Sequence, residues 1–436
     1  MHNYPVAVIM LRFDYSIERK KKQYMSGSSN FFAVLTSFRA YDYDICVNIY
    51  GNNDIVHMEV YQMDYLGKEI PKLGFGFMRL PVKDGAVDIE QTSKMVDLFL
   101  SSGFRYFDTA YGYGDGESEK AIKKTLVDRY PRDRFLLATK LPAWAAKTKA
   151  DAEQMLYTSL ERTGAGYFDF YLLHNLGEER TRCFDDYDIW NYLAQKKEAG
   201  LIRHLGFSIH DRAAVLDEIL TAHPEMEFVQ LQVNYADWEN ESIESRKCCE
   251  VARKHGKPII IMEPVKGGML ADPPKAITDL FYAADPAASP SSWAIRFAAS
   301  QDHVITVLSG MSSLGQMEDN LSYMTDFRPL TEKEYQTIDA AREVLAKLPT
   351  VPCTACAYCM KECPKQIAIY GTFQAINIVK LYNNLPAAKG SYHWNTEGQG
   401  RHKASACIKC GKCEKVCPQH IRIRQELAKA AAVLEA

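Results

Sequence analysis

From Met63 onward, short apolar segments alternate with longer amphipathic ones, and few folds are compatible with such an alternation. The pattern is typical of repeated strand–helix units that build a parallel sheet. It predicts strands at residues 72–77, 104–108, 135–139, 169–173, 203–207, 228–233, 258–262 and 304–308. Helices are predicted between them, at 88–102, 118–130, 150–163, 187–199, 211–223, 241–255, 290–300 and 314–325.

Eight strands and eight helices in this order match an α/β fold of the (β/α)8 TIM barrel type, which usually needs about 250 residues. A doubly wound open sheet is the alternative, but no Gly-x-Gly-x-x-Gly turn follows the first predicted strand. We therefore predict a barrel over residues 63–348, with one more helix from 331 at its C-terminal end. Residues 349–436 are expected to form a second, small domain.

Residues 1–60 show no sustained helical or strand period, and they contain a charge run, Glu18-Arg-Lys-Lys-Lys22. Three explanations remain open for this N-terminal extension. It could be a targeting or partner-binding extension, it could be a poorly ordered tail, or translation could begin at Met58 or Met63. No predicted chemistry falls in this segment.

Titratable residues stand at the ends of three predicted strands. Asp108 ends the second strand, Lys140 follows the third and His174 follows the fourth, while Tyr113 lies in a glycine-rich loop five residues after Asp108. Active sites of such barrels lie at the carboxyl ends of the strands, so we expect these side chains to meet in the barrel mouth. Taken singly, Lys140 could be a snorkelling lysine and His174 a structural histidine.

Together the four residues suit the reduction of a carbonyl group. A phenol titrates near pKa ~10 and is too weak an acid without help. We expect the Lys140 ammonium to lower the pKa of Tyr113 and the Asp108 carboxylate to keep that ammonium charged. His174 could hydrogen-bond and orient the carbonyl oxygen.

Phe107-Asp-Thr-Ala-Tyr-Gly-Tyr113, Ala138-Thr-Lys140 and Leu172-Leu-His174 resemble the three active-site segments of the aldo-keto reductase family. The resemblance extends from Tyr65 to Thr325 and includes Gly74-Phe-Gly-Phe-Met-Arg-Leu-Pro81, Ile202-Arg-His-Leu-Gly-Phe-Ser208, Gln230-Leu-Gln-Val-Asn-Tyr235 and Glu263-Pro-Val-Lys-Gly-Gly268. It implies that Tyr113 is the general acid, tuned by Lys140 and Asp108, and that His174 orients a small-molecule carbonyl substrate. It also implies a nicotinamide dinucleotide, NADP(H) or NAD(H), across the barrel mouth.

The same resemblance implies cofactor contacts. Ser208 and Gln232 match positions that hold the nicotinamide carboxamide. Segment 309–320 resembles the family's adenosine-phosphate loop and supplies the remaining candidates, Gly310, Ser312, Gln316 and Asn320. Physically, this loop offers backbone N–H groups and a helix N-terminus to an anion.

The chain departs from the family pattern at three cofactor positions. Ile209 stands where many members have asparagine, and Met262 replaces the aromatic residue that stacks on the nicotinamide. Gln316 occupies a position often held by an arginine that binds the 2′-phosphate. The preference for NADP(H) over NAD(H) is therefore a family-level expectation.

Eight of the twelve cysteines fall into two runs of identical spacing, Cys353-x2-Cys356-x2-Cys359-x3-Cys363-Pro364 and Cys407-x2-Cys410-x2-Cys413-x3-Cys417-Pro418. Bacterial ferredoxins with two [4Fe–4S] clusters have this spacing, and the fourth cysteine of each run ligates the other cluster. One cluster would use Cys353, Cys356, Cys359 and Cys417, and the other Cys407, Cys410, Cys413 and Cys363. Zinc also takes four cysteines, but it needs two pairs.

We therefore predict a small, mostly helical ferredoxin-like domain at residues 349–436. The 43 residues between the runs contain a predicted helix at 367–382 and a polar segment, 390–402, that is predicted to be a loop. The remaining cysteines are scattered, and Cys183, Cys248 and Cys249 are predicted to be buried or helix-surface thiols.

The two predicted redox centres handle different numbers of electrons. A nicotinamide delivers two electrons as a hydride, whereas a [4Fe–4S] cluster accepts one, so efficient exchange would need a converter such as a flavin. No flavin motif is present, although barrels bind flavins without one. Three functions stay open: a carbonyl reductase whose clusters serve a redox partner protein, a reductase with structural or oxygen-sensing clusters, and an electron-transfer protein without carbonyl reduction.

Bulk properties exclude other classes. The net charge of −3 gives no electrostatic case for nucleic acid or anionic membranes. No apolar run approaches the ~20 residues of a spanning helix, and no secretory signal is recognisable at the N-terminus. The cysteine spacing indicates metal ligation in a reducing compartment, so we expect a cytoplasmic protein. The sequence contains no signal for oligomeric state.

Overall fold

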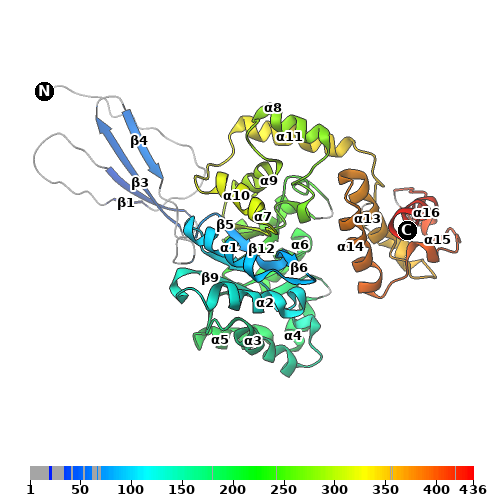
Figure 1. Ribbon diagram of the computed structural model, residues 1–436, viewed down its shortest axis with the longest axis horizontal. Coiled ribbons are helices and arrows are strands. Elements are labelled where there is room, and N and C mark those ends of the chain that lie inside the picture. Colours follow the sequence, from blue (N-terminus) through cyan, green and yellow to red (C-terminus); the bar gives the residue numbers. More distant parts are fainter. Residues whose placement is uncertain are drawn as a thin grey trace, which may run out of the picture. The chain divides into compact units, whose positions relative to one another are not determined.

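The computed structural model describes residues 19–21, 34–40, 43–52, 55–60, 66 and 70–436, except 179, 242, 354, 356 and 418, and the chain divides into unit 1–69 and unit 70–436 (Figure 1). In the first unit, four strands form an antiparallel sheet in chain order: β1 (Arg19–Lys21), β2 (Val34–Ala40), β3 (Tyr43–Asn52) and β4 (Ile55–Val60). The sequence pattern did not predict these strands. The rest of the 1–60 extension lies outside the described residues, and its three explanations stay open.

The second unit begins with a closed barrel of eight parallel strands, as predicted. The strands are β5 (Leu73–Gly76), β8 (Tyr106–Asp108), β9 (Leu136–Leu141), β10 (Phe168–Leu176), β11 (Ile202–Ile209), β12 (Phe228–Gln232), β13 (Ile259–Met262) and β14 (Val304–Ser309). The first strand closes the barrel by pairing with the last, and Gly74 lies opposite Leu308. A short hairpin of β6 (Val82–Lys83) and β7 (Ala86–Val87) follows β5.

Helices connect the barrel strands. They are α1 (Ile89–Ser101), α2 (Glu117–Ile122), α3 (Lys149–Thr163), α4 (Thr181–Asp186), α5 (Ile189–Glu198), α6 (Ala213–Ala222), α7 (Ser245–Lys254), α8 (Lys275–Ala284), α9 (Pro290–Ala299), α10 (Leu314–Met324) and α11 (Glu332–Lys347). All eight predicted helices are present. The helix predicted at 118–130 is an α-helix only to Ile122, and a π-helical turn follows it and ends at Val127. The pattern missed α4 and α8.

Helix starts follow ordinary capping chemistry. The Thr331 hydroxyl accepts from the Glu334 N–H, and the Glu334 carboxylate accepts from the Thr331 N–H, which forms a capping box at the start of α11. Ser289 caps α9, and Pro290 takes the first helical position, where the missing N–H costs nothing. These signals explain why the starts of α9 and α11 were readable from sequence.

The alternation of side chains along β8 decides which of its residues face the barrel interior, Asp108 among them. Phe107 packs against Phe99 of α1, with ring centroids 5.3 Å apart, so it faces the helices. Its neighbours point to the opposite side because strand side chains alternate. Tyr106 therefore packs inside the barrel against Phe170, with ring centroids 5.1 Å apart, and Asp108 accepts a hydrogen bond from Gln230 across the interior.

Residues 351–434 form a helical region with its own apolar core. Its helices are α12 (Tyr358–Lys361), α13 (Ile369–Tyr382), α14 (Leu385–Asn395), α15 (Lys412–Lys415) and α16 (Ile423–Leu434). The helical ferredoxin-like domain was predicted, but the loop prediction for 390–402 was wrong for residues 390–395, which are helical. α14 continues to Asn395 and is followed by a 3-10 turn at Glu397–Gln399, because Ala388 and Tyr392 are buried in this core.

Candidate active site and cysteine cavities

Asp108, Tyr113 and Lys140 meet at the carboxyl ends of β8 and β9. The Lys140 ammonium donates to Asp108 Oδ1 at 2.5 Å, to the Thr109 carbonyl oxygen at 2.8 Å and, more weakly, to the Tyr113 hydroxyl at 3.5 Å. Asp108 and Lys140 are 3% and 1% exposed, so the ion pair is shielded from water. Three of the four predicted residues are therefore brought together.

The loop that carries Tyr113 depends on glycine. Gly116 has φ +91°, and a Cβ there would lie 2.6 Å from the Arg162 guanidinium carbon. That guanidinium donates to the Tyr111 carbonyl oxygen at 2.9 Å and pairs with buried Glu119 at 3.2 Å. The close approach of Arg162 thus fixes the turn on both sides of Tyr113.

Burial decides the protonation of these groups. It raises the pKa of Tyr113, and this effect outweighs the Lys140 ammonium, so the predicted lowering of that pKa was wrong for this structure. Burial lowers the pKa of Lys140, but Asp108 and Tyr113 more than compensate and the pKa lies above its ordinary value. Burial also raises the pKa of Asp108, against the opposing effect of Lys140. Tyr113 is therefore a neutral hydroxyl beside a cationic lysine.

His174 lies near the end of β10, beside Tyr113, and the two ring centroids are 5.9 Å apart. Burial, reinforced by the charge of Lys140, lowers the pKa of His174 well below its ordinary value, so the imidazole is neutral. Its Nδ1 atom is buried and has no hydrogen-bond partner among the described residues. The indole Nε1 of Trp144 donates to the His174 carbonyl oxygen at 3.0 Å and holds this segment in place.

The two predicted nicotinamide contacts lie at the ends of neighbouring strands. Ser208 Oγ accepts from the Asn175 N–H at 2.8 Å, which leaves its own hydroxyl hydrogen available for donation. Gln232 donates through Nε2 to Asp237 at 2.9 Å, and its Oε1 lies 3.1 Å from His210 Nδ1. Gln232 is therefore held by protein partners on both sides of its amide.

The predicted phosphate-loop residues shape the turn between β14 and α10. Ser312 N–H donates to Gln316 Oε1 at 2.7 Å, and the Ser312 hydroxyl donates to the Arg79 carbonyl oxygen at 2.6 Å. Buried Asn320 donates to Ser309 Oγ at 2.7 Å. A Cβ at Gly310 would lie 3.9 Å from its nearest neighbours, so the backbone here is open on one side.

Two residues near the site were not singled out from the sequence. Gln230 is 1% exposed and donates to Asp108 Oδ2 at 3.4 Å, so it helps to satisfy the buried carboxylate. Arg79 follows β5 and places a half-exposed guanidinium 3.7 Å from Glu263. A Cβ built at Gly267 would lie 3.6 Å from the same guanidinium. A polar residue inside an apolar strand was the available signal for Gln230, whereas Arg79 gave none.

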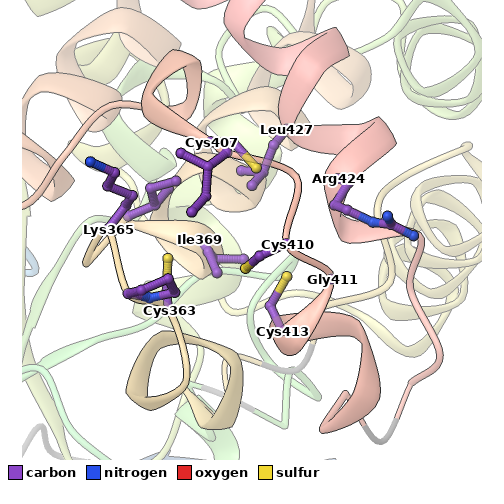
Figure 2. Close-up of a pocket in the computed structure, with 12 residues that line it drawn as sticks. Cys363, Lys365, Ile369, Cys407, Cys410, Gly411, Cys413, Arg424 and Leu427 are labelled. Atoms are coloured by element: carbon purple, nitrogen blue, oxygen red, sulfur yellow. The ribbon is translucent and has the colours of Figure 1, made fainter.

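Four cysteines line one cavity in the C-terminal region: Cys363, Cys407, Cys410 and Cys413. Figure 2 shows their sulfur atoms turned toward one another, with the ends of Lys365 and Arg424 directed away from the cavity. Cys353, Cys359 and Cys417 line a second cavity, and the predicted fourth member, Cys356, lies outside the described residues. Each cavity thus receives the last cysteine of the opposite run.

The cysteines surround these cavities rather than converge on a point. Within the described residues, no three His, Cys, Asp or Glu side chains lie close enough to hold a single metal ion. A zinc ion would need thiolates at about 2.3 Å, whereas a [4Fe–4S] cube is larger and has its ligands at separate corners. The cysteine sets fit a cluster.

Cys248 and Cys249 are buried in α7, and Cys183 is half-buried, as predicted. Burial raises the pKa of both Cys248 and Cys249 to about 12, so they are inert thiols. Among the described residues, no helix combines the length and apolar character needed to cross a membrane.

The Aldo/keto reductase family model matches residues 72–343, and a 4Fe-4S dicluster domain model matches residues 352–421. An aldo-keto reductase of Mycolicibacterium smegmatis is 31% identical over 144 residues, which are 33% of this chain and 47% of the relative. One of Mycolicibacterium vanbaalenii is 29% identical over 276 residues, 63% of this chain and 89% of the relative. Methylglyoxal reductase DkgA of Yersinia pestis is 33% identical over 159 residues, 35% and 51% of the two chains.

This chain therefore spans about half the length of the Mycolicibacterium smegmatis and Yersinia pestis relatives. Among solved structures, the holo form of an aldo-keto reductase from Bacillus halodurans has a TM-score of 0.51 at 23% identity, over 65% of this chain and 96% of that one. An aldo-keto reductase from Klebsiella pneumoniae in complex with NADPH has a TM-score of 0.51 at 19% identity, over 62% and 90%. These two likenesses show the shared fold.

Proposed function

We propose that this chain, which belongs to the aldo/keto reductase family over residues 72–343, reduces the carbonyl group of a small molecule with a nicotinamide dinucleotide. The observation that carries the proposal is the contact of the neutral Tyr113 hydroxyl with the buried Lys140–Asp108 ion pair, with neutral His174 beside it. This is an arrangement for delivering a proton to an oxygen atom at the barrel mouth.

In the proposed reaction, Tyr113 donates its hydroxyl proton to the carbonyl oxygen and is left as a phenolate. Lys140 keeps its positive charge and stabilises that phenolate until it regains a proton, while Asp108 holds the ammonium in place. Neutral His174 directs a ring N–H at the same oxygen and aligns the carbonyl. A bound nicotinamide supplies the hydride that, with this proton, converts the carbonyl into an alcohol.

The chain's residues fit such a cofactor. We propose that Ser208 and Gln232 hold the carboxamide, since the Ser208 hydroxyl is available as a donor. We propose that Gly310, Ser312, Gln316 and Asn320 build the loop at the N-terminus of α10 that receives the adenosine phosphate. NADP(H) is our choice over NAD(H), because a structural neighbour from Klebsiella pneumoniae is described in complex with NADPH.

We propose that the eight cysteines hold two [4Fe–4S] clusters. One set is Cys353, Cys356, Cys359 and Cys417, and the other is Cys407, Cys410, Cys413 and Cys363. The lining of the two cavities supports this division. The clusters would exchange single electrons with a redox partner.

Replacing the Tyr113 hydroxyl tests the function. Tyr113→Phe should lower kcat for aldehyde and ketone reduction by about 10²–10⁴-fold, the usual contribution of a positioned acid. Tyr106→Phe is the matched control, because the buried Tyr106 hydroxyl has no hydrogen-bond partner among the described residues. The assay follows NADPH oxidation with a carbonyl panel that includes methylglyoxal, the substrate in the name of the Yersinia pestis relative.

A Tyr113→Phe enzyme with kcat close to wild type would remove Tyr113 as the acid. A second candidate function is electron transfer through a barrel that binds a cofactor without reducing carbonyls. It is favoured by Ile209 and Met262, which replace family residues beside the nicotinamide. Wild-type protein that reduces no carbonyl, but whose clusters are reduced on mixing with NADPH, would establish it.

A further inference from the structure

The C-terminal region is basic, although the whole chain is slightly acidic. Residues 349–436 contain twelve lysines and arginines and only five aspartates and glutamates, whereas the net charge of the chain is −3. The cations gather around the second cysteine run. We call Lys365, Lys409, Lys412, Lys415 and Arg422 the basic rim; all five are exposed.

The charges of the basic rim are not neutralised by ion pairs with the described residues. Arg424 pairs with Glu414 at 2.8 Å, and Lys403 pairs with Glu397 at 2.7 Å. By contrast, no member of the basic rim makes an ion pair with a residue that the structure describes. Unpaired surface cations create a positive potential that reaches about a Debye length into solution.

The second cysteine run also carries exposed apolar side chains and an exposed candidate cluster ligand. Ile408 is 57% exposed and Val416 is 37% exposed, and both belong to the run Cys407–Cys417. Cys410 is exposed as well, and Ile408 and Lys365 line its cavity. Exposed apolar side chains with charged ones beside them in the chain are compatible with a protein interface.

The two cysteine cavities differ in charge. Lys365 and Arg424 line the cavity of Cys407, Cys410 and Cys413, and Figure 2 shows their charged ends directed outward. Among the described residues, those that line the cavity of Cys353 and Cys359 include no lysine, arginine, aspartate or glutamate. A negatively charged partner is therefore attracted to the first of these cavities, where Lys365 has no ion-pair partner among the described residues.

We propose that the basic rim with Ile408 and Val416 is the docking surface for a small, acidic one-electron carrier protein. The proposal rests on the proposed function, because the carrier is identified by the cluster assigned to these cysteines. A cluster held by these cysteines would exchange one electron with the carrier at each encounter, so the two would change by one oxidation level in opposite directions. The described residues that line this cavity include no aromatic side chain for base stacking, so an acidic protein fits better than a nucleic acid.

The test measures binding of a strongly acidic flavodoxin to the purified holoprotein by titration calorimetry. The variant Lys412→Glu/Lys415→Glu/Arg422→Glu reverses the rim without touching a cysteine. Its Kd should rise at least about tenfold, and the wild-type Kd should rise by a similar factor between about 50 and 300 mM NaCl, as screening predicts. The control Lys83→Glu/Lys124→Glu/Lys333→Glu has the same charge change at exposed barrel positions and should bind like wild type.

Iron and sulfide content and reduction by dithionite are measured on every protein. Wild type without clusters would overturn the cluster assignment, and with it the identity of the carrier, while wild type with clusters isolates the docking question. No flavodoxin binding at low salt, or equal weakening in the barrel control, would overturn the docking surface. So would displacement of flavodoxin by single-stranded DNA or by phosphatidylserine vesicles, because the rim would then be a general site for polyanions.

Discussion

The Lys140 ammonium has three donors, and three oxygen atoms surround it: Asp108 Oδ1, the Thr109 carbonyl oxygen and the Tyr113 hydroxyl. This explains how a lysine that is 1% exposed remains charged. The shortest contact is to Asp108 and the longest to Tyr113, so the ammonium is anchored by the carboxylate and only lightly attached to the phenol. When Tyr113 gives up its proton, Asp108 therefore still holds the Lys140 ammonium beside it.

Removing the ammonium should expose the cost of burying Asp108. Lys140→Met should lower the free energy of unfolding by about 3 kcal/mol at neutral pH, since it leaves an uncompensated buried charge. The double variant Asp108→Asn/Lys140→Met should recover most of this loss but not the activity. Chemical denaturation and NADPH oxidation measure the two effects.

The deficit of Lys140→Met should also depend on pH. Burial raises the pKa of Asp108, and the variant lacks the lysine that opposes this effect. A carboxyl group whose pKa is raised in the folded state binds its proton more tightly there than in the unfolded chain. The loss of unfolding free energy in Lys140→Met should therefore shrink as the pH falls toward ~3.9, the pKa of aspartate in the unfolded chain. A deficit of equal size at about pH 5 and about pH 8 would contradict this account.

The pH profile of catalysis follows from the same burial. His174 has a pKa well below its ordinary value and Tyr113 a pKa above its own, so neither titrates near neutrality. For carbonyl reduction, kcat/KM should stay flat from about pH 6 to about pH 9 and fall at higher pH, when Tyr113 or Lys140 loses its proton. The variant His174→Asn should show the same profile at a lower rate. An inflection near pH ~6.5 that this variant abolishes would instead mean that the histidine titrates.

At the residue scale, the sequence was informative where chemistry stands at the end of an apolar strand. Asp108, Lys140 and His174 could be found because strand ends in a barrel converge. The direction of the Tyr113 pKa shift could not be predicted from the sequence, because burial raises this pKa, the Lys140 charge lowers it, and only the structure shows which effect is larger. Gln230 reaches Asp108 from β12, and that contact exists only when the barrel closes.

At the element scale, α14 shows what a polar sequence can hide. Residues 385–395 include glycine, serine, histidine and asparagine, and composition predicts a loop for part of them. Asn384 caps the helix by accepting from the Ala387 N–H at 3.0 Å, and Ala388 and Tyr392 are buried in the core of the region. Tertiary burial on one face therefore decides the helix.

A pair of glycine substitutions tests the packing of α13 and α14. A Cβ at Gly371 of α13 would lie 2.5 Å from Asn395 Cβ, so Gly371→Ala should destabilise this region by about 1–3 kcal/mol. Gly390 of α14 has open space around it, so Gly390→Ala should stabilise by about 0.5–1 kcal/mol. Thermal unfolding of the holoprotein measures both. Destabilisation by Gly390→Ala would indicate that residue 390 is not helical.

At the scale of the whole molecule, the crossed cysteine assignment has a spectroscopic consequence. Cys417→Ser should remove the same paramagnetic resonance signal as Cys353→Ser, and Cys363→Ser the same signal as Cys410→Ser, because each pair lines one cavity. Iron content should fall by about half in each variant, since one of two clusters is lost. If Cys417→Ser instead matched Cys410→Ser, each run would hold its own cluster and the crossing would be wrong.

The sequence by itself determined the barrel, the helical cluster domain and the main candidates for chemistry. It could do so because these features are encoded locally, in strand–helix alternation, strand-end residues and cysteine spacing. Only the tertiary structure decided which groups touch, how burial sets their protonation, and where unpaired cations gather beside one cysteine cavity. These properties depend on distances between segments far apart in the chain, and a linear pattern does not contain those distances.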